Sequence, residues 1–377
     1  MKKIGLMGCG MIADYGHIPA ILATQGLEAW AVYDPNPDHA YGLQHKYGIP
    51  HGYAMSDMFF ESGIEAVVVT SAAPAHKQNV EEAARYGLPV LCEKPLAMTD
   101  ADAASMIQTM DDAGLLLTTG FCYRFSAVSQ NIKRLIQDGA IGEPRTLRLV
   151  YIWNLHGRDI VGPDGKPETN PYWLGRMNEG GPMVDCGVHQ IDLARWWLGS
   201  DVDHYQAAGA WVEKYEAPDH MWLHLDHENG AHTMAEMSFS YGHTVRDPRA
   251  HFSYHIIGTE GVIRYDREGW LFEVRNKFGT HQLPGSSEKD FEGMYAAFAH
   301  ALETGDTTGL PTGYDGLRAT QIARTATEAV IERHWRDTTC LCSDCSTGRT
   351  ATVNRIETAP KSLVLPPALA TVNGKHG

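Results

Sequence analysis

Three residues in two separate stretches of the chain have side chains suited to acid–base chemistry. Asp185 and His189 are four positions apart, so on a helix they lie on the same face. An unperturbed histidine has a pKa of about 6.5, which makes His189 a natural general base near neutral pH. Lys94 ends the apolar run of "LCEKPLA", residues 91–97, and its ammonium group can stabilise the charge of a developing alkoxide. These are the residue types needed to take a proton from an alcohol while it is oxidised.

The position of Lys94 depends on the strands around it. Residues 65–71 and 89–94 are short apolar runs, and we expect them to be neighbouring parallel strands. Lys94 then lies at the carboxyl end of its strand, which is the edge where doubly wound sheets bind ligands. Pro95 cannot extend the strand and restricts the next φ angle, so the backbone directs the lysine into that crevice. The alternative is a structural lysine that pairs with an acidic residue at the strand end.

The first 120 residues alternate short apolar runs with segments of helical periodicity. This alternation predicts an α/β fold with a doubly wound parallel sheet. The predicted strands are residues 2–8, 28–34, 65–71, 89–94 and 114–120.

After a linking helix at about 126–138, strand-like runs follow one another, which predicts an α+β region with a large, mostly antiparallel open sheet. We expect one helix at about 180–198 to interrupt it and two late helices to pack back on the rest, at about 290–304 and 314–335. The predicted strands are residues 145–155, 204–213, 220–228, 231–241, 250–258, 261–266 and 270–276. The predicted divisions are a nucleotide-binding domain at 1–122, a substrate and oligomerisation domain at 123–336 and a tail at 337–377.

The stretch "GCGMIA" after the first predicted strand has the spacing of a dinucleotide-binding loop. Gly8 permits the tight turn, Gly10 lets a pyrophosphate approach the backbone, and the small Ala13 allows helix and strand to pack closely. The start of the next helix, at Met11 and Ile12, presents N–H groups and a partial positive charge to the phosphates. A purely structural turn is the alternative.

Asp34 ends the second predicted strand, where a carboxylate can accept hydrogen bonds from the adenosine ribose hydroxyls. Its charge would repel a 2′-phosphate, and no Arg or Lys follows it in "DPNPDHA". We therefore predict that the cofactor is NAD rather than NADP. The alternative is that Asp34 only starts a turn before Pro35.

The glycine loop, Glu93-Lys94-Pro95 and "GGPMVDCGVHQIDLARWWLG" together resemble the glucose–fructose oxidoreductase / inositol dehydrogenase (Gfo/Idh/MocA) family, from residue 2 to about 335. The resemblance implies an N-terminal Rossmann domain followed by an α+β domain with a large open sheet. It implies that Lys94 contacts both the nicotinamide ribose and the substrate, and that Asp185 and His189 lie beside the reacting carbon. Two alanines occupy positions where the family often has Pro-Asn. The further cofactor contacts that it implies are Ser71, Ala73, His76, Glu93 and Tyr123.

With that placement, His189 is expected to act as the general base and Lys94 to polarise the same hydroxyl. Asp185 is expected either to bind an adjacent hydroxyl or to orient His189. Asp192 continues the same helix face, and we interpret it and Arg124 as structural. The spacing of Cys and His in this region predicts no metal site.

The long Gly/Pro-punctuated segment 154–181 is the best candidate for choosing the substrate. Aromatic rings suit the apolar face of a sugar, and guanidinium groups suit hydroxyls or an acidic substituent. The substrate-binding residues that we predict are Lys94, Tyr123, Arg158, Tyr172, Trp173, Arg176, Asp185 and His189. The alternative is that this segment forms an oligomer contact.

The leading interpretation is an NAD-dependent dehydrogenase or reductase that acts on a secondary hydroxyl or ketone of a sugar, sugar derivative or cyclitol. A glycoside hydrolase that oxidises its substrate transiently with bound NAD is the second. That hydrolase would need a further acid and base, for which His156, Asp159 and Tyr172 are candidates. The third is an NAD-sensing regulatory protein without catalytic activity.

The composition points away from nucleic acid and membranes as partners. The formal net charge is −15, which disfavours binding to nucleic acid or to an anionic membrane surface. No stretch approaches the roughly 20 apolar residues of a membrane span, and the glycine-interrupted N-terminus is not expected to be a signal peptide. Seven cysteines, mostly scattered, indicate reduced thiols in a cytoplasmic protein.

Two further features bear on possible partners: the face of the second sheet and the cysteines near the end of the sequence. The sheet predicted for residues 204–276 would expose an apolar face, so we expect a homodimer or homotetramer to cover it. Near the end, "HWRDTTCLCSDCSTG" contains four potential ligands for zinc, but without the usual paired spacing. Structural metal, disulfide or reactive thiols, and a tail without such a role remain alternatives there. The four residues are His334, Cys340, Cys342 and Cys345.

Overall fold

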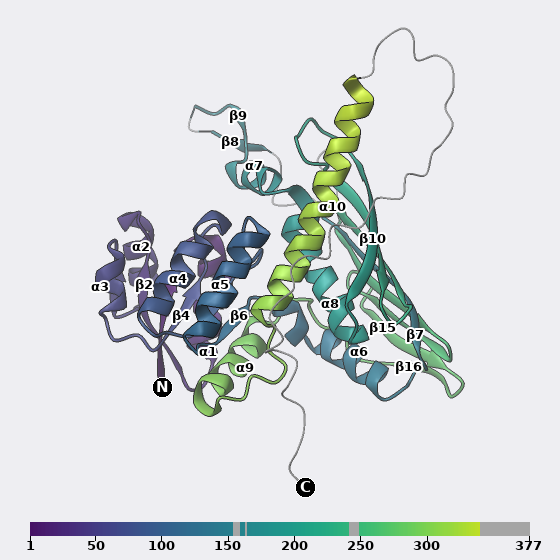
Figure 1. Cartoon of the computed structure of the whole chain (residues 1–377), viewed down its shortest axis with the longest axis horizontal. Coiled ribbons are helices and arrows are strands. Elements are labelled where there is room, and N and C mark those ends of the chain that lie inside the picture. The colour runs from purple at the N-terminus through teal and green to yellow at the C-terminus, as the bar shows by residue number, and fades with distance from the viewer. Residues whose placement is uncertain (154–158, 163, 241–248, 340–377) are drawn as a thin grey trace. The chain divides into compact units, whose positions relative to one another are not determined.

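The computed structural model of the chain describes residues 1–153, 159–162, 164–240 and 249–339, and no side chains at 159, 167, 172 and 335–339. The chain begins with a six-stranded parallel sheet built from the short apolar runs of the sequence (Figure 1). The strands are β1 (Lys2–Met7), β2 (Leu27–Tyr33), β3 (His51–Tyr53), β4 (Ala66–Val69), β5 (Val90–Cys92) and β6 (Leu117–Thr119). Their order, β3-β2-β1-β4-β5-β6, is that of a dinucleotide-binding doubly wound fold, which confirms the predicted fold class.

Helices connect these strands, and local sequence signals mark their ends. Asn36 caps α2 by accepting the N–H of Asp38, and Gly48 ends it with a left-handed φ of 65°. Thr99 caps α5 in the same way by accepting the N–H of Asp102. All four residues of β4 are buried, as expected of a strand covered on both faces. The helices here are η1 (Ala13–His17), α1 (Ile18–Ala23), α2 (Pro37–Tyr47), α3 (Ser56–Phe60), η2 (Ala73–Ala75), α4 (His76–Arg85) and α5 (Asp100–Asp112).

A second sheet of eight strands follows, and it is mostly antiparallel, as predicted. Its order is β10-β11-β12-β7-β13-β14-β15-β16, and only the central pair of β12 and β7 is parallel. The strands are β7 (Pro144–Ile152), β10 (Val202–Ala210), β11 (His220–His227), β12 (His232–Ser238), β13 (His251–Gly258), β14 (Gly261–Asp266), β15 (Leu271–Asn276) and β16 (Gly279–Gln282).

Helices cover one face of the second sheet, and α8 packs directly on β7 and β12 (Figure 1). The large helix predicted at 180–198 begins as a π-helical segment, η4, and continues as α8. A small hairpin of β8 (Asp159–Val161) and β9 (Pro167–Thr169) precedes α7. The remaining helices are η3 (Cys122–Phe125), α6 (Ala127–Gln137), α7 (Pro171–Asn178), η4 (Met183–Gly187), α8 (Val188–Leu198), α9 (Phe291–Thr304) and α10 (Gly313–Thr339).

The elements that the sequence pattern did not reveal are all short. The strand β3 has three residues, and β16 lies at the edge of its sheet with all four residues exposed. Neither length is enough for a hydrophobic period to be recognised. The helix α7 falls in the segment that we predicted only as a long loop.

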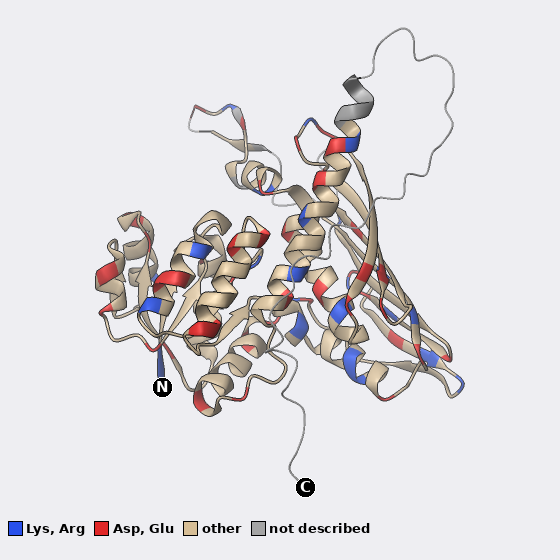
Figure 2. Ribbon diagram, in the orientation of Figure 1, with Lys and Arg blue, Asp and Glu red and all other residues tan. Residues whose placement is uncertain are grey.

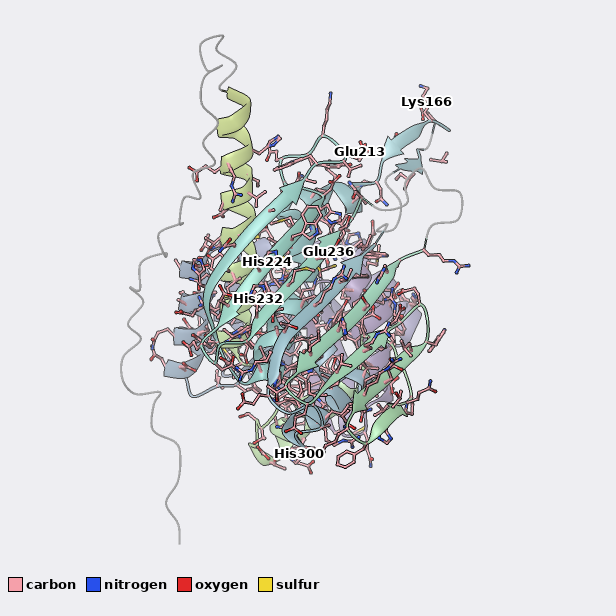
Figure 3. All side chains as sticks on the ribbon, turned by 90° about the vertical axis from the view of Figure 1, so that its right-hand side faces the viewer. Lys166, Glu213, His224, His232, Glu236 and His300 are labelled. Carbon is pink, nitrogen blue, oxygen red and sulfur yellow. The ribbon has the colours of Figure 1, made fainter. Side chains whose placement is uncertain are left out.

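The uncovered face of the second sheet differs from the prediction. The strand register places histidine and acidic residues on it, among them His224, His232 and Glu236, which Figure 3 shows on this side. His224 Nδ1 lies 3.1 Å from His232 Nε2, and the alternate residues Leu223 and Leu225 are buried on the helical side. The face is therefore mixed rather than apolar, since Trp222 and Met234 lie on it beside their strand partners Glu236 and His224. The oligomeric state stays a prediction.

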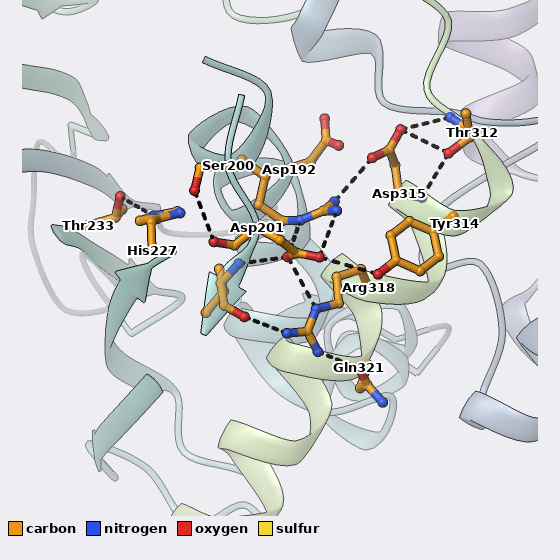
Figure 4. Close-up of polar contacts among 12 residues, drawn as sticks. Asp192, Ser200, Asp201, His227, Thr233, Thr312, Tyr314, Asp315, Arg318 and Gln321 are labelled. Atoms are coloured by element: carbon orange, nitrogen blue, oxygen red, sulfur yellow. Dashed lines mark hydrogen bonds and ion pairs between the residues drawn. The ribbon is translucent and has the colours of Figure 1, made fainter. Parts of the chain in front are cut away.

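A buried ion pair and a partly buried group of ion pairs connect α8 to its neighbours. In η3, Arg124 donates from Nε to Asp192 Oδ2 (2.7 Å) and from Nη2 to Oδ1 (2.5 Å). Just beyond α8, Asp201 accepts from Arg195 Nε (2.9 Å) and from Arg318 Nε of α10 (3.3 Å) (Figure 4). The structural roles predicted for Arg124 and Asp192 are confirmed.

Charged residues of both signs are interspersed along the ribbon in Figure 2, including along α10. Among the described residues, no helix is long and apolar enough to cross a membrane.

Candidate active site

A cavity of about 580 Å³ opens at the carboxyl edge of the first sheet, where doubly wound folds bind ligands. Its lining combines the glycine loop with residues from the ends of β4, β5 and β7 and from η4 and α8. The predicted site residues that line it are Gly10, Met11, Ile12, Ser71, Ala73, Glu93, Lys94, Tyr123, Arg176, Asp185 and His189.

Lys94 reaches across this cavity to Asp185. Because β4 and β5 are neighbours, the end of β5 places Lys94 at the predicted edge. Its Nζ donates to Asp185 Oδ1 (2.7 Å) and to the Asp185 carbonyl oxygen (2.8 Å). Arg176 of α7 contacts the same Oδ1. Burial opposes ionisation of Asp185, but Arg176 and Lys94 hold the pKa of its carboxyl well below its usual range.

Lys94 stays charged in this setting. Burial would lower its pKa, but the carboxylate of Asp185 raises the pKa of Lys94 above its usual value. The site thus holds an ammonium group in a fixed position, which is what stabilisation of an alkoxide requires.

His189 is held by aromatic stacking rather than by a carboxylate. Its ring lies parallel to that of Tyr123, at a centroid distance of 4.0 Å and an angle of 3°. Its Nδ1 is buried and has no hydrogen-bond partner among the described residues. Burial and the charge of Lys94 lower the pKa of His189 well below its usual value, so the imidazole is neutral and able to accept a proton. The alternative in which Asp185 orients His189 is wrong, since Asp185 instead binds Lys94.

Glu93 belongs to a buried chain of hydrogen bonds behind Lys94. Its Oε1 lies 2.9 Å from His17 Nε2, and His17 Nδ1 lies 2.6 Å from the hydroxyl of Tyr295. Burial opposes ionisation of Glu93, but His17 and then Lys94 lower its pKa to about 2. This chain connects the first helix, the end of β5 and α9.

The glycine loop has the shape that a dinucleotide needs. Gly8 has a φ of 106°, and a Cβ on it would lie 2.4 Å from the backbone nitrogen of Ser71, so only glycine fits. A Cβ on Gly10 would meet no atom within 4 Å, which leaves this backbone open to a ligand. Asp34 Oδ2 accepts the N–H of Cys9 (2.9 Å) and so joins the loop to the end of β2. These residues fit an NAD molecule with its pyrophosphate over the loop.

Four described residues of the predicted site are not in the cavity lining: Gly8 and Asp34 belong to the loop region described above, and His76 and Trp173 lie elsewhere. The side chain of His76 is buried, and its ring nitrogens contact the carbonyl oxygens of Ser71 (2.9 Å) and Pro95 (3.0 Å), so it joins two loops; its cofactor contact stays a prediction. Trp173 is 0% exposed, and its Nε1 donates to the Tyr215 hydroxyl (2.7 Å). Its predicted contact with substrate is wrong, because the ring is part of the core.

Other predictions fall outside what is described. Arg158 and His156 lie outside the described residues, as do the three tail cysteines Cys340, Cys342 and Cys345. Tyr172 lies in α7 and Asp159 is the first residue of β8, but their side chains are not described. The ring of His334 stacks on Trp211 at a centroid distance of 3.9 Å. The described residues include no group of three or more metal-binding side chains.

Several cavity residues were not predicted from the sequence. Tyr151 and Trp153, at and just after the end of β7, stack at 5.6 Å and add an aromatic wall to the cavity. The alternation of side chains along β7 could have indicated them, because Tyr151 and Trp153 are two positions apart and so lie on the same face. Tyr15 and Lys289 are far apart in the sequence, and no local signal brings them together.

Two family models match the chain. Residues 2–121 match the model described as "Oxidoreductase family, NAD-binding Rossmann fold", and residues 129–264 match "GFO/IDH/MocA C-terminal domain". D-apiose dehydrogenase of Rhizobium rhizogenes is 29% identical over 281 residues, which cover 74% of this chain and 76% of that protein. The 1,5-anhydro-D-fructose reductase of Ensifer adhaerens is 28% identical over 327 residues, which cover 84% and 92%. The NAD(+)-dependent scyllo-inositol 2-dehydrogenase of Bacillus subtilis is 24% identical over 269 residues, which cover 69% and 72%.

Solved structures share the fold over most of the chain. An oxidoreductase from Agrobacterium radiobacter, in complex with NAD+, L-tartaric acid and magnesium, has a TM-score of 0.73 at 25% identity and covers 87% of this chain and 96% of its own. Levoglucosan dehydrogenase, in complex with NADH and levoglucosan, has a TM-score of 0.75 at 20% identity, with coverage of 88% and 97%. The second likeness concerns the fold alone.

Proposed function

Because this chain belongs to the Gfo/Idh/MocA family of NAD-binding oxidoreductases, we propose that it transfers a hydride between NAD and a secondary hydroxyl or ketone of a sugar, sugar derivative or cyclitol. One observation carries this proposal: Lys94, Asp185 and His189 line the same cavity as the open glycine loop. The named relatives include dehydrogenases of apiose and inositol, which supports a polyhydroxylated substrate.

The three residues have complementary roles in this proposal. When bound, NAD supplies the hydride acceptor. His189, neutral in its buried position, takes the hydroxyl proton of the substrate. Lys94 polarises that oxygen and stabilises its negative charge. Asp185 fixes Lys94 through the 2.7 Å contact. Arg176 forms a second ion pair with the same carboxylate.

The cavity also suggests how a carbohydrate binds. Tyr123 and Tyr151 offer aromatic surface, and burial raises the pKa of both phenols well above the usual value, so both hydroxyls can donate hydrogen bonds. Arg176 lines the cavity from α7 and can reach hydroxyls or an acidic substituent. Arg158 and Tyr172 stay predictions.

The test follows the fate of the cofactor. Purified protein is incubated with NAD and a panel of free sugars, cyclitols and aryl glycosides, while NADH absorbance and released aglycone are measured together. We expect stoichiometric NADH from a free sugar or cyclitol, with the glycosides untouched. Release of aglycone without net NADH would overturn the proposal and indicate an NAD-assisted hydrolase.

Cofactor preference depends on Asp34. Its carboxylate lies at the end of β2, where it can bind the ribose hydroxyls and repel a 2′-phosphate. We expect the wild-type protein to bind NADH more tightly than NADPH, and Asp34→Ala to narrow the ratio of the two dissociation constants by about tenfold, since a hydrogen bond to a charged group contributes about 1.5–3 kcal/mol. Titration of intrinsic fluorescence measures both constants.

A matched control is Asp38→Ala, which removes the same charge from an exposed position in the first turn of α2. It should leave the ratio unchanged. Equal affinity of the wild-type protein for the two cofactors would contradict the role of Asp34.

A further inference from the structure

Lys289 lies in the cavity but takes no part in the pairing described above. It precedes α9 and lines the cavity together with Tyr15, Cys122, Cys186 and His189. Its Nζ lies 3.3 Å from the Tyr15 hydroxyl, next to the glycine loop. A residue 274 positions from Tyr15 in the sequence thus brings a positive charge to the cofactor-binding edge.

The carboxylates next to Lys289 in the sequence are engaged elsewhere. Glu288 Oε1 accepts from Arg267 Nη1 (2.7 Å), and Asp290 Oδ1 caps α9 by accepting the N–H of Gly293 (2.7 Å). Among the residues that the structure describes, no carboxylate forms an ion pair with Lys289. The other cavity cations, Lys94 and Arg176, both contact Asp185.

The remaining groups that face Lys289 are uncharged at neutral pH. Burial raises the pKa of the Cys122 thiol to about 12 and also raises that of Cys186. Burial and nearby Lys94 lower the pKa of His189, and Lys289 itself adds to this effect. Burial opposes the charge of Lys289, and its ammonium group hydrogen-bonds to the Tyr15 hydroxyl (3.3 Å) rather than to a carboxylate. A partly buried cation without an anionic partner is unfavourable unless a ligand supplies one.

We propose that Lys289 is an anion-binding residue of this cavity, which pairs with an anionic oxygen of a bound ligand. This inference rests on the proposed function, because the ligands of that function offer two such oxygens. One is a pyrophosphate oxygen of the dinucleotide, and the other is a carboxylate or phosphate on the carbohydrate. The shared chemistry is a charge-assisted hydrogen bond from an ammonium group to an oxyanion.

The experiment compares wild-type protein with Lys289→Met, which keeps the length of the side chain and removes its charge. Calorimetric titration gives dissociation constants for NADH, ADP-ribose and adenosine, and for D-glucuronate and D-glucose on protein saturated with NADH. If Lys289 binds the pyrophosphate, ADP-ribose and NADH should bind about tenfold more weakly while adenosine is unchanged. If it binds a substrate anion, D-glucuronate alone should weaken by a similar factor.

Two further variants keep the result interpretable. Lys289→Arg keeps the charge and should restore most of the affinity. Lys277→Met removes an exposed lysine that pairs with Glu260 and should change none of the constants. The proposal is overturned if neither ADP-ribose nor D-glucuronate binds more weakly to Lys289→Met. Failure of the proposed function would be seen separately, as a wild-type protein that binds NADH but oxidises no carbohydrate of the panel.

Discussion

Replacement of Lys94 by alanine should reduce the turnover number by about two or more orders of magnitude, because a positioned charge that stabilises an alkoxide is lost. The fold should survive, since Asp185 keeps its contact with Arg176. Steady-state kinetics on a substrate identified from the carbohydrate panel measures the effect. Lys77→Ala is the matched control, because it removes a half-buried lysine of α4 that pairs with Glu81 and Asp102, and it should leave turnover unchanged.

The pH profile separates a catalytic role of Lys94 from a structural one. The charge of Lys94 is one of the causes, after burial, that lower the pKa of His189. Without that charge the imidazolium form is less disfavoured, so the pKa of His189 rises. The acid limb of kcat/KM should therefore move to higher pH in Lys94→Ala. Turnover close to that of the wild-type protein would refute the role that we assign to Lys94.

Arg124→Met should lower the free energy of unfolding by about 3–5 kcal/mol, the usual cost of leaving one member of a buried ion pair without its partner. Asp192 is 1% exposed and receives two hydrogen bonds from Arg124. Urea denaturation followed by circular dichroism measures the change. Arg145→Met breaks an exposed pair with Glu143 and, as the control, should cost no more than about 1 kcal/mol.

The effect of Arg124→Met should depend on pH with a definite sign. Burial raises the pKa of Asp192 to about 6, even with Arg124 in place. Without Arg124 that pKa rises further, so the folded protein binds the proton more tightly than the unfolded chain does, and stability falls as the pH rises through the folded pKa. The loss should be larger at about pH 8 than at about pH 5. The double variant Arg124→Met/Asp192→Leu should recover most of the stability, and a loss that persists would mean that unpaired charge is not its cause.

Much of the fold could be predicted because its signals are local. The apolar runs of β1, β2 and β4 alternate with helical segments, and this pattern alone indicates a parallel sheet. The predicted edge position of Lys94 followed from the adjacency of β4 and β5, which the structure confirms. The four-residue spacing predicted that Asp185 and His189 share one helix face, and both line one cavity, although it was the family resemblance that implied their place beside the reacting carbon.

The character of exposed surfaces was harder to predict, because it depends on which face of a strand is covered. Along β11 and β12, His224 and His232 alternate with buried residues, and only the pairing register shows that they share the open face. Register is set by contacts between strands, which composition does not describe.

The sequence by itself determined the glycine loop, the acid after it and the residue types proposed for catalysis, since each depends on neighbours within a few positions. Only the tertiary structure decided which polar groups pair. Lys94 and Asp185 are 91 positions apart, and Lys289 and Tyr15 are 274 positions apart. Trp173 is of a residue type that suits sugar binding, but its side chain lies in the core. The physical reason is that burial and charge pairing are properties of contacts between distant segments, which form only when the chain folds.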